Sequence, residues 1–250
     1  MMAPPARSHS GEGITEPPLD LAERGRGRDG GSVRLDRRLF MRLTPMGECT
    51  DVRPLVEALR ASPINGVLYE DVNDPRGVAL LAFHEDPGYF LGPVAHVLRE
   101  PPFRDLVPKR ELAMLGRSYA IGYESDLEET LLHRPRERVC NPAWPWAIWY
   151  PLRRTGSFEQ LAIEQQRAVL AEHGGVGRTF AADGYAHDIR LACHGLDPND
   201  NDFLVGLVGP ALHPLSVLVQ HMRRTAHTAM YLDRIGPFFV GRAVWQADQR

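Results

Sequence analysis

The sequence predicts an α+β fold in which one chain holds two ferredoxin-like repeats that close into a dimeric α/β barrel. The order strand, helix, strand, strand, helix, strand occurs twice, over residues 36–133 and 145–250, with a connector at 134–144. Each copy would form an antiparallel sheet with helices on one face, so its other face must be buried elsewhere. Two such sheets can bury these faces against each other, and the lumen of the resulting barrel is expected to be a ligand cavity.

Apolar spacing and turn residues define the elements of the first repeat. The helix over 50–60 begins at Thr50, a good capping residue, and the Asn73-Asp-Pro-Arg76 turn separates two apolar strands. Pro101-Pro102 stops the second helix. The expected strand, helix, two strands, helix and strand lie at residues 38–44, 50–60, 66–72, 77–83, 87–99 and 117–123.

The second repeat follows the same pattern after a short expected helix at 125–132. Its first helix has a capping-box-like start at Ser157-Phe-Glu-Gln160 and is expected to end near His173, with Gly174 as its C-terminal glycine. A turn rich in Asp and Asn separates its two middle strands. The expected elements lie at residues 146–152, 157–173, 187–193, 203–208, 215–229 and 238–245.

Composition limits the classes of function. The net charge of −3 gives no case for binding nucleic acid or a membrane surface, and no apolar run approaches the ~20 residues of a membrane span. The three cysteines, at 49, 140 and 193, are isolated, which argues against a disulfide framework and suits a reducing cytoplasm. Residues 1–35 are rich in Pro, Gly, Ser and Arg and are expected to be a disordered leader. We therefore expect a cytoplasmic protein.

Three side chains are candidates for function. Period-two alternation places Arg190 with Asp188 on one strand face, which we expect to line the lumen; Arg190 would then need an anionic ligand or an ion pair with a nearby Asp. His173 could be a metal ligand, although a histidine before a helix-terminal glycine is also a favourable cap. Tyr150 is a lumen candidate, although a core tyrosine is the commoner case.

Four motifs in order resemble the chlorite dismutase-like superfamily, most closely its coproheme decarboxylase (haem synthase) branch. The resemblance extends over about residues 37 to 246 and is strongest in the second half. Members share the duplicated barrel, commonly as homopentamers, and hold haem or coproheme in the C-terminal half. The motifs are Trp149-Tyr150-Pro151-Leu152-Arg153-Arg154, Glu172-His173-Gly174 to Gly177-Arg178, Gly195-Leu196-Asp197 and Gly236-Pro237-Phe238-Phe239-Val240-Gly241.

The resemblance implies a role for each candidate residue. His173 resembles the axial ligand of the haem iron, and Tyr150 the redox-active tyrosine that attacks a porphyrin propionate. The distal position falls on Arg190 or, in a second alignment, Asp188; Arg190 is favoured because extra residues fit most easily in the turn. The remaining arginines of the motifs are candidates for pairing with propionates: Arg153, Arg154 and Arg178.

The implied activity is peroxide-dependent decarboxylation of iron coproporphyrin III to haem b, with hydrogen peroxide as the oxidant. Chlorite dismutation or haem peroxidase activity is the alternative, favoured by an arginine at the distal position. A non-catalytic porphyrin-binding barrel is the third possibility. The glutamate that pairs with the axial histidine in the family has no clear counterpart near residue 227, where His227 or Thr228 could replace it.

Overall fold

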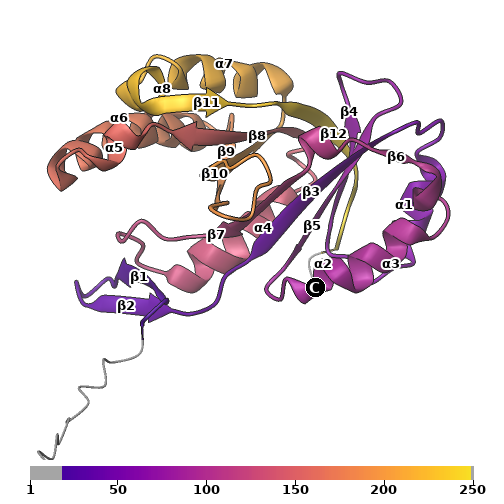
Figure 1. Ribbon diagram of the computed structural model, residues 1–250, viewed down its shortest axis with the longest axis horizontal. Helices are drawn as coiled ribbons and strands as arrows, with labels where there is room; N and C mark the ends of the chain where they lie inside the picture. Colours follow the sequence, from indigo (N-terminus) through magenta and orange to yellow (C-terminus); the bar gives the residue numbers. More distant parts are fainter. Residues whose placement is uncertain (1–18, 249–250) are drawn as a thin grey trace, which may run out of the picture.

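The computed structural model describes residues 19–248 and contains the two expected repeats (Figure 1). Segments between the strands of the first repeat form short helices, and a π-helical turn, Glu129–His133, follows its last strand. The elements up to the connector are β3 (Phe40–Gly47), α1 (Arg53–Arg60), β4 (Gly66–Asp71), β5 (Val78–His84), α2 (Gly88–Leu91), α3 (Pro93–Arg99), a 3-10 turn (Phe103–Asp105), β6 (Val107–Pro108), a 3-10 turn (Arg110–Leu112), β7 (Met114–Ser118) and α4 (Arg134–Val139).

The second repeat adds one strand to the expected set. Its helical region after β8 divides into a short and a long helix, and the segment before the last strand forms an edge strand, β11. The elements are β8 (Trp146–Arg154), α5 (Gly156–Glu159), α6 (Ile163–Ala182), β9 (His187–Ala192), β10 (Phe203–Gly209), α7 (Leu212–Met222), α8 (Ala226–Tyr231), β11 (Leu232–Ile235) and β12 (Phe239–Gln246).

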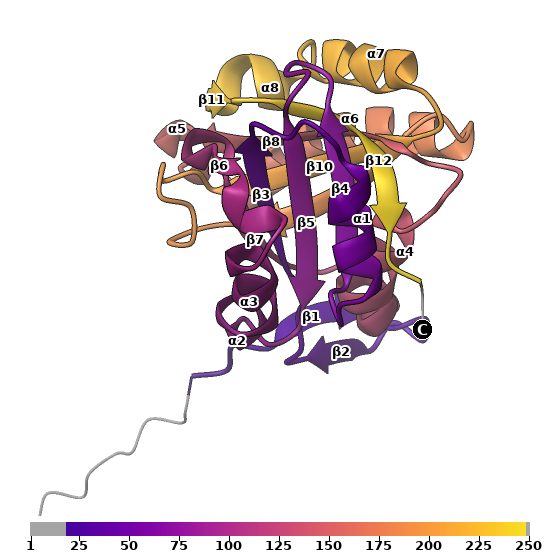
Figure 2. The same ribbon diagram turned by 90° about the vertical axis from the view of Figure 1, so that its right-hand side faces the viewer.

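Strand pairing confirms the duplicated ferredoxin-like architecture. The spatial order is β7-β3-β5-β4 in the first repeat and β12-β8-β10-β9 in the second, so both repeats place their first and third strands in the middle. The repeats join where β7 pairs with β9 and where β4 pairs with β12. Both junctions are antiparallel, and together they close the sheet into the barrel whose crossing strands are visible in Figure 2.

Side chains fill the barrel, so the expectation of a ligand cavity in the lumen is wrong. Trp149 is fully buried there together with Met41, Tyr69 and Leu191, and its ring takes the space opposite a glycine, Gly206. A β-carbon at Gly206 would lie 2.5 Å from the Trp149 ring. An aromatic core of this size leaves no room for a porphyrin, because packed protein interiors contain few voids larger than a water molecule.

Helices cover the outer face of each half. Helices α1, α2 and α3 lie over the strands of the first repeat, and α6, α7 and α8 lie over those of the second (Figure 1). No residue of α6 is fully buried although the helix is 20 residues long. This helix is therefore only partly packed against the strands beneath it.

The expected disordered leader is wrong for its second half. Strands β1 (Glu23–Arg26) and β2 (Ser32–Leu35) form a hairpin, in which the Arg26 N–H donates a hydrogen bond of 2.9 Å to the carbonyl of Glu124. Glu23 accepts from Arg117 and from the Ala120 N–H, both at 3.0 Å. The composition of this segment alone does not favour an ordered structure, so we attribute its order to these contacts with the loop after β7. The leader before residue 19 lies outside the described residues.

The connector is also more regular than expected, because α4 occupies most of it. The last strand of the first repeat is β7, which begins three residues earlier than the expected strand and ends at Ser118. Within residues 19–248, no helix is both long and apolar enough to cross a membrane.

Gly206→Val should overfill the barrel and lower the free energy of unfolding by about 1–3 kcal/mol, because the added methyl groups meet a ring that cannot move away. Urea unfolding measures the change. Gly156→Ala is the matched control, since nothing lies within 4 Å of a β-carbon at that position and the variant should unfold like the parent. Equal stability of the Gly206 variant and the control would contradict the description of a filled core.

Candidate functional site

The predicted site residues gather on the outer face of the second repeat, beneath its helices, and not in the lumen. Ile189 and Leu191 point into the filled barrel, so the alternation of β9 sends Asp188 and Arg190 outward. Tyr150 on β8 also faces outward and packs in the layer below α6 and α7. The expectation that Tyr150, Asp188 and Arg190 line the lumen is therefore wrong. An unpaired guanidinium inside a dry barrel would be too costly, whereas the outer layer leaves Arg190 partly solvated.

His173 lies in the middle of α6 and not at its end. The helix continues through Gly174, Gly175 and Gly177 to Ala182, so the expected C-terminal cap at Gly174 is wrong. Each glycine inside a helix costs about 1 kcal/mol relative to alanine. Packing of α6 against α7, α8 and β9 overrides that local preference. The ring of His173 contacts Thr225 and His227, at the start of α8.

One hydrogen bond links His173 to the neighbouring helix. Its Nδ1 lies 3.1 Å from the Thr225 Oγ1, and the Thr225 hydroxyl lies 2.8 Å from the Met222 carbonyl, to which it can donate. When it donates there, Thr225 can only accept from Nδ1, and the proton of the ring then lies on Nδ1. This arrangement leaves Nε2 with a lone pair, for which residues 19–248 provide no hydrogen-bond partner. A neutral imidazole with a free Nε2 is the form that binds a metal ion.

A second histidine lies directly beside the first. The ring of His227 meets the ring of His173 edge to face at 4.8 Å, and its Nε2 accepts from the Arg154 Nε at 3.2 Å. Burial first, and then the cation of Arg154, lower the pKa of His173, which favours the neutral ring at neutral pH. Burial, followed by the charges of His173 and Arg154, lowers the pKa of His227 to about 3.

Tyr150 is buried and protonated. Its ring stacks on Phe238 with centroids 4.7 Å apart, and burial followed by the negative charge of Asp188 raises its pKa. The positive charge of Arg223, at the end of α7, lowers the pKa of the same phenol, by less than burial raises it. Tyr150 thus has an apolar face toward Phe238 and charged groups of both signs within electrostatic reach.

Asp188 and Arg190 form an ion pair, with Arg190 Nε 3.2 Å from Asp188 Oδ2. Arg138 of α4 also donates to Asp188, at both its carboxylate, 3.0 Å away, and its carbonyl. The ion pair that was the alternative for Arg190 is therefore present. It engages only Nε, and the Arg190 side chain is 47% exposed, so its terminal nitrogens stay available to an anion.

The three arginines predicted to pair with propionates are placed differently. Arg153 donates to the carbonyls of Asn199 and Asp200, both at 2.7 Å, so it holds the loop after β9. Arg154 lies between the rings of Phe158 and Phe203, 4.4 Å from each centroid. Arg178 is exposed on α6, five residues after His173 and so about 140° around the helix from it. Of the three, Arg154 acts electrostatically on His173 and donates to the neighbouring His227, and the pairing of these arginines with propionates stays a prediction.

Sequence reasoning missed four residues of this site. Thr225 is the hydrogen-bond partner of His173, whereas the sequence suggested His227 or Thr228, two and three residues further on. Arg138 and Arg223 come from segments with no motif. Tyr119, which follows β7, packs on Phe203 at 5.5 Å and lies within electrostatic reach of Arg190 and Arg154; burial raises its pKa. Only Thr225, as an N-cap residue before a short helix, carries a sequence signal.

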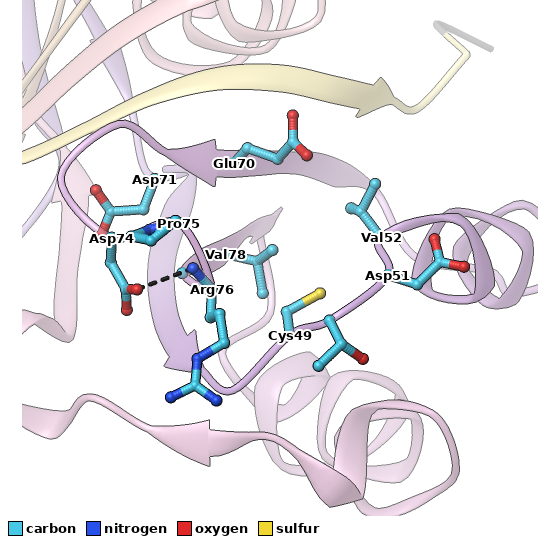
Figure 3. Close-up of a pocket in the computed structure, with 11 residues that line it drawn as sticks. Cys49, Asp51, Val52, Glu70, Asp71, Asp74, Pro75, Arg76 and Val78 are labelled. Carbon is cyan, nitrogen blue, oxygen red and sulfur yellow. Dashed lines mark hydrogen bonds between the residues drawn. The ribbon is translucent and has the colours of Figure 1, made fainter.

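A separate hollow of about 290 Å³ lies at the far end of the first repeat, near the β4–β5 turn (Figure 3). Several carboxylates line it, but Asp51 pairs with Arg53 at 2.8 Å and Asp74 with Lys109 at 2.6 Å. Burial raises the pKa of Cys49 at its edge, so the thiol stays protonated. The hollow therefore has little free charge to offer a ligand.

The fold and this arrangement define a duplicated α/β barrel with a half-buried histidine of lowered pKa on a helix of its second half. Residues 76–244 match the model of the chlorite dismutase family, which is more than half of the chain, and the protein belongs to that family. A search of curated protein sequences found no significant match.

Solved structures share the fold at low sequence identity. One is a novel heme-binding protein from Thermus thermophilus, with a TM-score of 0.65, 18% identity, and coverage of 83% of this chain and 91% of that one. Another is the chlorite dismutase of Candidatus Nitrospira defluvii in complex with imidazole, with a TM-score of 0.61, 15% identity, and coverage of 84% and 92%. These similarities extend over nearly the whole described chain.

His227 should make the protein acid-sensitive. Its folded-state pKa of about 3 lies below the ordinary histidine value of 6.5, so the unfolded chain takes up the proton first as the pH falls. The contribution of His227 to the free energy of unfolding is constant above pH ~6.5. It is lost progressively down to pH ~3, by up to about 1.4 kcal/mol per pH unit.

Urea unfolding between pH 7 and 4.5 measures this slope. His227→Gln keeps an acceptor for Arg154 but cannot titrate. The free energy of unfolding of this variant should therefore change less below pH ~6.5, by up to about 1.4 kcal/mol per pH unit, which corresponds to one proton. Between pH 7 and 8 the two proteins should show the same pH dependence. Equal slopes of parent and variant at pH 5 would show that His227 is not buried as a neutral ring.

Proposed function

We propose that the chain binds an iron porphyrin between α6 and the outer face of β8, β9 and β10, with His173 as the axial ligand of the iron. The observation that carries the proposal is the contact of the His173 Nδ1 with the Thr225 hydroxyl, which leaves Nε2 without a partner among the described residues. The partial burial of α6 above an apolar layer that includes Tyr150 and Phe238 supports it, because binding sites for flat ligands are lined mainly by apolar and aromatic side chains. The heme-binding relative of the same fold supports it further.

We propose further that the reaction is the oxidative decarboxylation of iron coproporphyrin III to haem b. The bound iron porphyrin would supply the redox chemistry, with hydrogen peroxide as the oxidant. Tyr150 would be the side chain that is oxidised and attacks a propionate; its phenol stays protonated until then because it is buried beside a carboxylate. Arg190 would bind an anionic group through the nitrogens that Asp188 leaves free. Phe238 and the helices above would exclude water.

Chlorite dismutation or peroxidase activity is the second candidate. The half-exposed guanidinium of Arg190 supports it, because a cation of this kind can hold an anionic oxidant. Oxygen release from chlorite that is lost in Arg190→Gln would favour this candidate, whereas coproheme conversion without oxygen release would favour decarboxylation.

His173→Ala should lower the affinity for coproheme and haem at least about tenfold, or about 1.4 kcal/mol, because the iron loses its protein ligand. An absorbance titration measures binding and shows whether the histidine-ligated spectrum disappears. His213→Ala is the control, since that histidine is exposed on the neighbouring helix α7. Unchanged binding and spectrum in His173→Ala would remove the assignment.

Tyr150→Phe should keep coproheme binding but lower decarboxylation at least about a hundredfold, which corresponds to about 2.7 kcal/mol in the barrier. Adding peroxide to the loaded protein and weighing the pigment by mass spectrometry follows the loss of the two carboxyl groups. Tyr123→Phe, an exposed tyrosine, should convert coproheme like the parent. Full conversion by Tyr150→Phe would exclude the tyrosine from the reaction.

We also propose a homo-oligomer, with the pentamer as the expected form. The shared family supports an assembly, and light scattering after size exclusion would measure it against the 28.0 kDa of one chain.

A further inference from the structure

Thr225 is the hydrogen-bond partner of the His173 Nδ1. It is buried at the N-cap of α8, and its hydroxyl has the Met222 carbonyl at 2.8 Å as its nearest acceptor, closer than the Thr228 hydroxyl at 3.5 Å. With its proton on that carbonyl, Thr225 offers His173 a lone pair, at 3.1 Å from Nδ1. A hydroxyl in this position accepts a hydrogen bond without taking the proton, because its own basicity is negligible.

The nearest carboxylate in the sequence does not compete for that proton. Glu172 adjoins His173, but its Oε2 accepts from the Ala226 N–H at 3.1 Å. Glu172 and His173 therefore dock α8 onto α6 through two adjacent residues, the first with its carboxylate and the second with its ring. Within residues 19–248, no carboxylate oxygen hydrogen-bonds to His173.

The other neighbour cannot take the proton either. His227 uses its Nε2 lone pair to accept from Arg154, so its own proton is on Nδ1, which is buried without a partner among the described residues. A ring with one nitrogen protonated and the other already accepting has no lone pair left for His173. The groups in contact with His173 are therefore a hydroxyl and a neutral ring. Burial lowers the pKa of His173, and at longer range the cations Arg154 and Arg190 lower it further, whereas the carboxylates Asp188 and Glu172 raise it.

We propose that Thr225 is a positioning residue that holds His173 as the neutral Nδ1–H tautomer and denies it the carboxylate partner that would make it a stronger donor. The part of this that concerns iron rests on the proposed function. A ligand histidine gains basicity when a carboxylate accepts its N–H, and a more basic ligand favours the ferric state. The iron porphyrin of this chain should then be easier to reduce than it would be with a carboxylate at position 225.

The tautomer is tested without any porphyrin, by nitrogen NMR of the histidine rings. The parent should show a protonated Nδ1 and a free Nε2 for His173. Thr225→Val has the same shape but no acceptor, and should shift His173 to a mixture of tautomers, whereas Thr225→Ser should restore the parent pattern. Thr179→Val is the control, because it removes a hydroxyl on α6 that hydrogen-bonds to the Gly175 carbonyl and not to His173. A protonated Nε2 in the parent, or no change in Thr225→Val, would overturn the proposal.

The effect on iron is tested by redox titration of the protein loaded with haem. Thr225→Asp should lower the midpoint potential, by about 59 mV for each tenfold gain in preference for the ferric form. Thr225→Ser should leave the potential as it is, and Thr225→Val should weaken haem binding about tenfold. A potential that does not fall in Thr225→Asp would overturn the iron part. Failure of every variant and of the parent to bind porphyrin would defeat the proposed function, while the NMR result still decides the role of Thr225.

Discussion

The closed and filled barrel is the constraint on which the rest of the structure depends. Once β7 pairs with β9 and β4 with β12, the eight strands enclose a volume that Trp149 and its apolar neighbours occupy. A ligand as large as a porphyrin must then lie outside the barrel. The helices of each repeat cover much of its outer face, and the predicted site residues Tyr150, His173, Asp188 and Arg190 lie on that side of the sheet.

The filled barrel separates the predictions that local spacing supports from those that depend on the whole fold. The order of elements and the duplication follow from apolar periodicity, which depends on local spacing, and the strand pairing confirms them. The alternation of β9 correctly separates Asp188 and Arg190 from Ile189 and Leu191, but alternation alone does not say which set faces the lumen. The volume of the barrel decides this, and it depends on all eight strands at once.

Other errors have the same origin in tertiary contacts. Gly174 stops a helix in isolation, yet α6 continues because α7, α8 and β9 hold it. Residues 23–35 look disordered by composition but form a hairpin on the loop after β7. Arg153 and Arg154 lie in a family motif that does not reveal their contacts in the folded chain, where Arg153 donates to two loop carbonyls and Arg154 lies between two aromatic rings. The partner of His173 could be found only in the folded chain, because Thr225 is 52 residues away.

The hairpin has a consequence for how the chain can be shortened. Glu23 accepts from the Arg117 guanidinium and from the Ala120 N–H, so it contacts the residues on both sides of the segment that carries Tyr119, whose ring packs on Phe203 at the rim of the candidate site. Gly25 lies so close to the Glu124 carbonyl that a larger residue would lift the hairpin away. Trimming the first 35 residues as dispensable would therefore loosen the loop that carries Tyr119 at the rim of the candidate site, and a shortened version of the protein should keep the β1–β2 hairpin with Glu23.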